Sequence, residues 1–149
     1  MWPLLALLAR DGVLFAVWQH DVDFRVENRN DRGTLRARRT FAFATGDRVM
    51  VDAVSIDGGR LVDRLGRRGT VRAHLEAWVD AGALELRSTS ARVLGIPIPR
   101  AVAPTMRLTE RWDDETGRQH VALTLDAPLL GRLYEYTGSF TYEIHEEAP

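Results

Sequence analysis

Four charged side chains break the alternation of apolar and polar residues along the chain, and they are the first candidates for chemistry. They are Arg39, Asp63, Glu110 and Glu135, each with apolar residues two positions away. A charge that faces an apolar interior is costly unless it is paired. We therefore predict that Arg39 is largely buried and bound to a carboxylate. Glu110 is the first choice, because its own apolar neighbours mark the inward face most clearly. Asp63 and Glu135 are the other two candidates.

Three aromatic residues near these charges complete the candidate ligand-binding set. Trp112 shares the parity of Glu110: it lies two positions further along the chain, so both side chains point to the same face of a strand. Tyr134 and Tyr136 lie on the parity opposite to Glu135, so all three can face inward only if the strand is twisted or bulged. Binding pockets usually combine apolar walls with a few converging polar groups. The predicted ligand-binding residues are therefore Arg39, Asp63, Glu110, Trp112, Tyr134 and Tyr136.

Three interpretations of the charged set stay open. A β-bulge could shift the register and return these side chains to water, since a one-residue slip reverses every side chain. The charges could form a buried ion pair with a purely structural role. They could also anchor a polar ligand or act as an acid or base, in which case burial would raise the pKa of Asp63 or Glu110.

Absent residue types and motifs exclude several other chemistries. The chain has no cysteine, and all 20 of its basic residues are arginine. Disulfides, thiolate ligands, a cysteine nucleophile and a lysine Schiff base are thereby ruled out. His74 and Glu76 share one strand face, but no third metal ligand lies near them in the sequence. No serine-hydrolase, zinc-protease or phosphate-loop motif occurs. We predict no catalytic residue, no metal and no cofactor.

Alternating segments separated by turn residues must position these side chains. Side chains along a strand point to opposite faces in turn, so a period of two predicts half-buried strands. Gly, Asn and Asp between the segments favour hairpin turns. The predicted strands are residues 22–28, 34–44, 48–56, 60–65, 71–79, 83–94, 105–113, 118–127 and 131–144. The predicted fold class is all-β: an antiparallel meander of about nine strands over residues 22–145, curled into an open or closed barrel.

Two segments depart from this alternation. Residues 1–20 are largely apolar and are predicted to form a short helical lead-in with Pro3 in its first turn. Residues 94–104 hold three of the six prolines and are predicted to form an extended apolar crossing with a helical turn at 100–103. This crossing could cap one end of the barrel or form the rim of a cavity. Strand 48–56 has apolar residues on both parities, so we expect cover on both faces, from the N-terminal helix or a second chain.

Length and charge bound the class of protein. With 149 residues, 45% hydrophobic and 28% charged, the chain is expected to form a single domain over residues 1–149. A net charge of -1 argues against nucleic acid as a partner. The N-terminal apolar runs are too short to be a transmembrane segment and lack the basic flank of a signal peptide, so a cytoplasmic location is expected.

Arginines are distributed unevenly along the chain. Six lie between Arg29 and Arg48 against two aspartates, and five lie between Arg60 and Arg72 against one. A basic face built from these two runs could meet an acidic protein, an anionic ligand or a membrane surface. It could also be an ordinary solvated face of the sheet.

Three segments resemble elements of one bacterial family. Residues 94–104 resemble its LGxPLPxxLxP signature, and residues 59–66 resemble its GxLxExxG element, with Asp63 in place of the usual glutamate. Residues 128–138 resemble its PxxGxLxxYxG ending. In this order they resemble the domain of unknown function 4166 family from about residue 20 onward. Ala37 stands where that family tends to carry a tryptophan.

This resemblance implies an accessory role. Members of the family are often fused behind an NAD(P)-binding reductase of the saccharopine-dehydrogenase-like kind, so an NAD(P)-dependent reductase is the implied partner. The chain itself carries no dinucleotide-binding fingerprint. The family has no established activity, and the resemblance therefore implies a partner rather than a reaction.

The leading functional prediction is a non-enzymatic small-molecule-binding or accessory domain, which holds an apolar ligand or docks beside a reductase. One alternative is an enzyme that uses inward-facing carboxylates as general acid or base. A second alternative is a structural interaction module with a filled core. An apolar void of roughly a few hundred cubic ångströms would favour the binder, and a void with a carboxylate that lacks an arginine partner would favour the enzyme. A packed interior would favour the interaction module.

Overall fold

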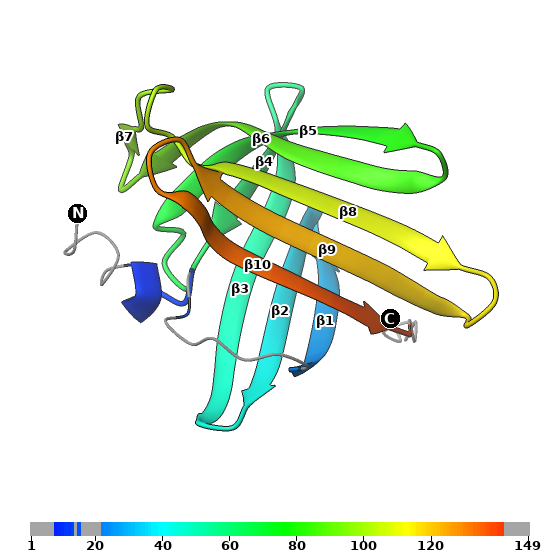
Figure 1. Ribbon diagram of the computed structural model, residues 1–149. Helices are drawn as coiled ribbons and strands as arrows, with labels where there is room; N and C mark the ends of the chain where they lie inside the picture. Colours follow the sequence, from blue (N-terminus) through cyan, green and yellow to red (C-terminus); the bar gives the residue numbers. More distant parts are fainter. Residues whose placement is uncertain (1–7, 14, 16–21, 142–149) are drawn as a thin grey trace.

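The computed structural model describes residues 8–13, 15 and 22–141, and strands dominate them (Figure 1). Nine strands follow one another in a single antiparallel sheet in chain order, and the two-residue β7 pairs with β6 beside this path. The strands are β1 (Asp23–Asp31), β2 (Thr34–Phe43), β3 (Gly46–Asp57), β4 (Arg60–Leu65), β5 (Val71–Asp80), β6 (Ala83–Val93), β7 (Ile96–Pro97), β8 (Thr105–Asp113), β9 (Arg118–Ala127) and β10 (Gly131–Phe140). The predicted meander is therefore confirmed.

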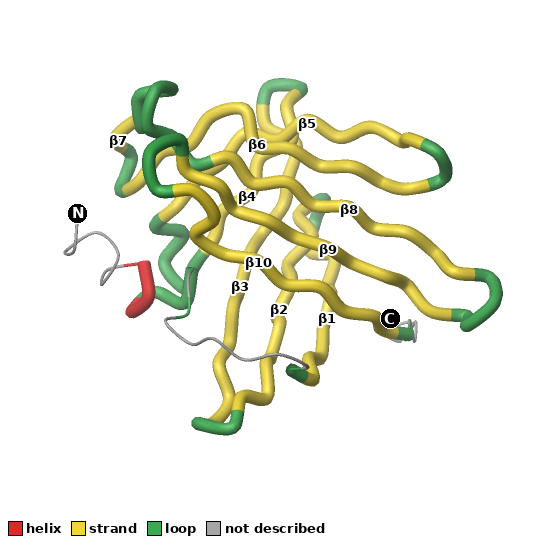
Figure 2. The backbone as a smooth tube through the Cα atoms, viewed as in Figure 1, coloured by secondary structure: helices red, strands yellow, loops and turns green. Residues whose placement is uncertain are grey.

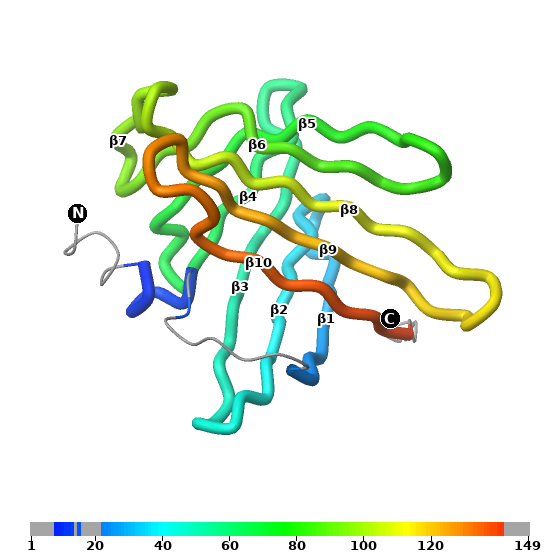
Figure 3. The backbone as a smooth tube through the Cα atoms, viewed as in Figure 1, coloured from blue at the N-terminus to red at the C-terminus, as the bar shows by residue number. Residues whose placement is uncertain are grey.

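The sheet curls until its first and last strands approach each other, which gives a nearly closed barrel (Figures 2 and 3). Within residues 22–141 no backbone pairing joins β1 to β10, and side chains fill the seam between them instead. The Phe24 ring lies 6.1 Å from the Tyr136 ring and 6.0 Å from the Phe140 ring. Gly138 provides the space, because a Cβ there would overlap the Phe24 ring.

The interior combines this aromatic cluster with aliphatic side chains from the other strands. Phe41 is 3% exposed and lies between Phe24 and Phe43, with ring centroids 5.7 and 6.2 Å away. Phe15, from the N-terminal segment, packs edge-on against Phe41 at 5.5 Å. Apolar burial of this kind is the main stabilising term for the sheet.

The N-terminal segment packs beside the turn that follows β4. Only residues 8–10 are helical among the described residues, so the predicted lead-in is one short turn there. The remainder of residues 1–20 lies largely outside the described residues. Asp11 is buried and accepts hydrogen bonds from the Arg68 backbone N–H at 3.2 Å and from the Thr70 hydroxyl. The described residues contain no helix with the length and apolar character needed to cross a membrane.

The proline-rich segment contains a turn near the predicted position. The cover expected on both faces of strand 48–56 is incomplete, because Ile56 is 75% exposed. After β7, a hydrogen bond from the Val102 N–H to the Pro99 carbonyl (3.0 Å) closes a turn, where a helical turn was predicted. In β3, Met50 is buried, and an added Cβ at Gly12 would lie only 2.9 Å from the Val49 carbonyl oxygen. The N-terminal segment therefore lies against β3.

Candidate functional site

Arg39 reaches from β2 to β3, where it forms an ion pair with Asp52. The Arg39 side chain is 20% exposed and the Asp52 side chain 5%. In the β2–β3 register Asp52 lies opposite Ala37, and Met50 lies opposite Arg39. Asp52 is therefore the diagonal neighbour of Arg39 on the same face, within reach of a long side chain. The prediction that Arg39 is largely buried and paired with a carboxylate is correct.

The predicted partners of Arg39 were wrong. Glu110 lies on β8 opposite Leu84 and Val121, and the described residues include no ion partner for it. Glu135 points outward, where it pairs with Arg132 at 2.9 Å. Asp52 was not predicted as the partner, because β3 has apolar residues on both of its faces and its inward face could not be assigned from alternation alone.

Asp63 lies on β4 and faces the interior, as its parity predicted. It is 7% exposed, and its backbone lies between Val54 of β3 and Ala73 of β5. Its Oδ1 atom has no hydrogen-bond partner among the described residues. Burial raises the pKa of Asp63 to about 6, while the nearby positive charge of Arg39 opposes that rise. Because Arg39 is already bound to Asp52, Asp63 is a buried carboxyl group with unused hydrogen-bonding capacity.

A cavity of about 130 Å³ lies beside Asp63. Its walls are almost entirely apolar and come from β3 to β6, from β8 to β10, from the N-terminal segment and from the proline-rich segment. Leu8 and Val13 of the N-terminal segment contribute to it, and so do Ile98 and Pro104 of the proline-rich segment. Besides Asp63, the polar side chains that line it are Ser88 and Tyr134.

The hydroxyl oxygen of Ser88 already accepts one hydrogen bond within the protein. Its Oγ accepts a hydrogen bond from the Met106 backbone N–H at 2.8 Å. A buried polar atom whose bonding capacity is unmet favours any ligand that supplies the missing partner. In this lining, that atom is Oδ1 of Asp63.

A register shift explains why both tyrosines face inward. The β9–β10 pairing is irregular between Arg132 and Tyr134, so that Tyr134 lies opposite Leu125 and Tyr136 opposite Leu123. Burial raises the pKa of both tyrosines, and the Arg39 charge acts in the opposite direction on each. The bulge therefore resolves the conflict on this strand: the tyrosines take the interior and Glu135 takes the solvent side.

The predicted ligand-binding residues thus occupy different places. Asp63 and Tyr134 line the cavity. Arg39 and Tyr136 lie beside it, near enough for Arg39 to influence the pKa of Asp63 and of Tyr136. Trp112 is 49% exposed, and its Nε1 donates to Asp114 Oδ1 at 3.1 Å, so it does not line the cavity. Glu110 is half-buried and outside the lining as well.

The cavity suits a ligand rather than a metal. In the described part of the chain, no three residues of the metal-binding types gather closely enough to hold an ion. Glu76, which shares a strand face with His74, pairs with Arg87 at 2.9 Å. A single carboxyl group in an apolar chamber can accept a hydrogen bond when it is ionised and donate one when it is protonated.

The chain was compared with protein families, curated proteins and solved structures. No curated protein and no solved structure matches the chain. The family described as "Domain of unknown function (DUF4166)" matches residues 1–140. The match includes the cavity-lining residues and all three segments that resemble that family in the sequence. The chain therefore belongs to the DUF4166 family.

Proposed function

We propose that this protein binds a small, largely apolar molecule in the interior cavity and that Asp63 forms the single polar contact with it. The observation that carries this proposal is Oδ1 of Asp63, a buried atom without a hydrogen-bond partner beside an almost wholly apolar void of about 130 Å³. Apolar cavities near this size can hold a benzene-sized molecule.

The expected ligand has an apolar body and one hydrogen-bond donor, such as a hydroxyl or an amine. Because the pKa of Asp63 is about 6, the carboxyl group is mostly ionised at neutral pH and accepts a hydrogen bond there. A donor on the ligand would satisfy Oδ1, and a hydrogen bond to a charged group in such surroundings is stronger than one between neutral groups.

Two of the three methionines make this proposal testable without knowing the natural ligand. Met50 and Met106 both line the cavity, so methyl-¹³C methionine labelling places reporters in its wall. We expect benzyl alcohol to shift both methyl signals in a saturable way. An Ala91→Leu variant, which fills part of the lining, should abolish these shifts and keep a folded spectrum. If benzyl alcohol leaves both signals of the wild-type protein unmoved, the proposal is wrong.

A second candidate is proton transfer by Asp63. A cavity with a carboxylate that lacks an arginine partner was the feature expected of an enzyme, and Asp63 borders the cavity of about 130 Å³ while Arg39 is paired with Asp52. The supporting observation is its pKa of about 6 next to a cavity, because a general base works best when its pKa lies near the working pH. The carboxylate would take a proton from a carbon next to a carbonyl group and return a proton to the same carbon. Exchange of the α-hydrogens of cyclohexanone in D₂O tests this directly. Faster exchange with the wild type than with Asp63→Asn supports catalysis. Equal exchange rates would rule out catalysis by Asp63 and leave ligand binding as the proposed function.

A further inference from the structure

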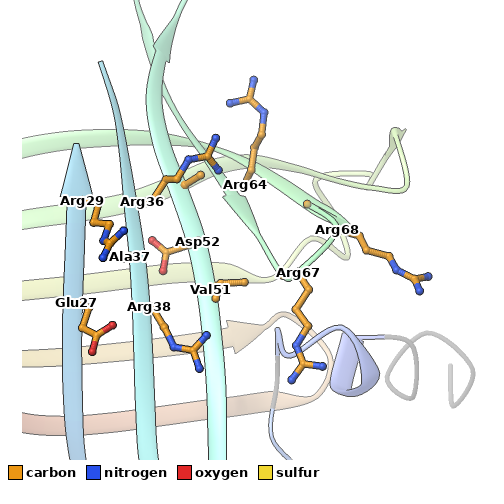
Figure 4. A pocket seen from close by; sticks show the side chains of 13 residues that line it. Glu27, Arg29, Arg36, Ala37, Arg38, Val51, Asp52, Arg64, Arg67 and Arg68 are labelled. Carbon is orange, nitrogen blue, oxygen red and sulfur yellow. The ribbon is translucent and has the colours of Figure 1, made fainter. Parts of the chain in front are cut away.

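The outer face of the sheet holds a second hollow, and six of its thirteen lining residues are arginine. This groove has a volume of about 610 Å³ and extends over β1 to β4 and the turn that follows β4. Six of the residues that line it are Arg29, Arg36, Arg38, Arg64, Arg67 and Arg68. Figure 4 shows them on neighbouring strands and on that turn. The two arginine-rich runs of the sequence therefore meet in one place.

The strand register explains why the surface is hollow here. Arg29 lies directly opposite Arg36 across β1 and β2, and Arg36 in turn lies opposite Ala53 of β3. On the far side of Ala53 the opposing residue is Arg64. Side chains that face each other in an antiparallel sheet point to the same face. A short side chain, Ala53, therefore forms the floor between long arginines.

The positive charge of the groove is not neutralised by the protein itself. Glu27 and Asp52 also line the groove, but they already pair with Arg25 and Arg39. Arg36 and Arg64 have aspartate partners, at 3.5 and 3.8 Å. Arg29, Arg38, Arg67 and Arg68 have no ion partner within the described residues. Like charges opposite one another in a sheet are destabilising, so this arrangement favours a bound anion.

The turn that carries two of these arginines is held in a defined position. Asp11 accepts hydrogen bonds from the Arg67 and Arg68 backbone N–H groups, through its carbonyl oxygen at 3.1 Å and its carboxylate at 3.2 Å. Gly66 has a φ of +91°, and a Cβ there would overlap the Asp11 carboxylate. A prepositioned group loses less entropy when it binds a ligand than a mobile one does.

We propose that this groove binds a small molecule that carries two or more phosphate groups. Guanidinium groups form paired hydrogen bonds with phosphate oxygens, and four unpaired arginines match the charge of a polyphosphate. The concave shape and the volume of about 610 Å³ are typical of small-molecule sites. This site shares no lining residue with the Asp63 cavity, so either proposal can fail without the other.

Calorimetric titration with tripolyphosphate at low ionic strength tests the proposal. We expect saturable binding that weakens as salt is added. The variant Arg38→Gln/Arg67→Gln should weaken it about tenfold or more. Arg107→Gln/Arg111→Gln is the matched control, since it removes the same charge from exposed β8 positions outside the groove. The control should change the affinity by about twofold at most.

Two results of the calorimetric titration would overturn the proposal: no saturable binding of tripolyphosphate to the wild type, or an equal loss of affinity in both double variants. Vesicles of phosphatidylglycerol and phosphatidylcholine separate a soluble ligand from a lipid headgroup. Release of the protein from such vesicles by tripolyphosphate, or failure to bind them, supports the groove as a phosphate site. Vesicle binding that tripolyphosphate does not affect would mean that the basic face meets a membrane surface instead.

Discussion

Asp63 is the residue on which the proposed function depends, and its burial lowers the free energy of unfolding when the carboxyl group is ionised. Its pKa is about 6 in the folded protein, against an ordinary value of 3.8. The native state therefore binds more protons than the unfolded chain between about pH 4 and pH 6, and the free energy of unfolding falls as the pH rises through this window. Above it, the ionised carboxylate destabilises the native state by about 3 kcal/mol.

Asp63→Asn should remove this pH dependence. We expect the variant to match the wild type at about pH 4 and to be more stable by up to about 3 kcal/mol at about pH 8. Urea unfolding at both pH values measures the difference. Asp80→Asn, at an exposed position, is the control and should keep the wild-type profile. If the wild type and Asp63→Asn lose stability in parallel as the pH rises, Asp63 is not a buried acid with a raised pKa.

The Arg39–Asp52 ion pair gives a second prediction at the level of single residues. Arg39→Ala leaves Asp52 buried without its partner and should destabilise the protein by about 3 kcal/mol. Arg39→Met combined with Asp52→Leu should recover much of this loss, because both charges are then absent. Thermal and urea unfolding of the single and double variants measure the coupling. Glu110→Gln should change stability by less than about 0.5 kcal/mol; a loss as large as that of Arg39→Ala would assign the pair to Glu110 after all.

Alternation in the sequence correctly assigned Arg39 and Asp63 to the inward face, because each lies on a strand with one apolar face. It also assigned Trp112 inward, and that side chain is 49% exposed. The partner Asp52 could not be assigned, because Val51 and Ala53 beside it are as apolar as Met50. Tyr134 was undecided because a bulge is a local backbone irregularity without a period of its own.

Gly138 allows β10 to lie close to β1 at the seam of the nearly closed barrel, and this contact gives the first prediction at the level of elements. A Cβ at residue 138 would overlap the Phe24 ring across the seam between β10 and β1. Gly138→Ala should therefore destabilise the protein by about 1–3 kcal/mol through overpacking. Phe24→Leu should cost less in the Gly138→Ala background than in the wild type, since the smaller side chain relieves the overlap. Additive losses in a urea double-mutant cycle would show that the two residues do not meet.

The N-terminal segment holds the turn after β4, and Asp11 is its main contact. Asp11→Ala removes the carboxylate that binds the Arg68 N–H and the Thr70 hydroxyl. We expect a loss of about 1–3 kcal/mol and faster amide hydrogen exchange at Arg67 and Arg68. Asp47→Ala, at an exposed position, is the control. Unchanged exchange at these two amides in Asp11→Ala would contradict the assigned contact.

At this scale the order of the elements was predictable, and the ends of the barrel were not. Turn residues and period two give the nine-strand meander with most boundaries within a few residues. The cavity, however, takes Leu8 and Val13 from one end of the sequence and Ile98 and Pro104 from the middle. These residues lie in segments without periodicity, where a sequence pattern does not determine which side chains meet.

For the whole molecule, the inner and outer faces of the same strands carry different chemistry. The interior has one carboxyl group with a free oxygen in an apolar cavity, and the outer groove has four arginines without ion partners in the described part of the chain. A net charge of -1 conceals this separation, because it averages the basic groove with acidic residues elsewhere. The overall charge argued only against general binding to nucleic acid, and the strand register is what brings the arginines together.

The central claim is that Asp63 recognises a hydrogen-bond donor on an otherwise apolar ligand. The most direct test is the ratio of the affinities for benzyl alcohol and toluene, which differ by one hydroxyl group, read from the methyl signals of Met50 and Met106 at about pH 8. We predict that the wild type prefers benzyl alcohol by about tenfold and that Asp63→Leu binds the two equally. An identical ratio in the wild type and in Asp63→Leu would contradict the account.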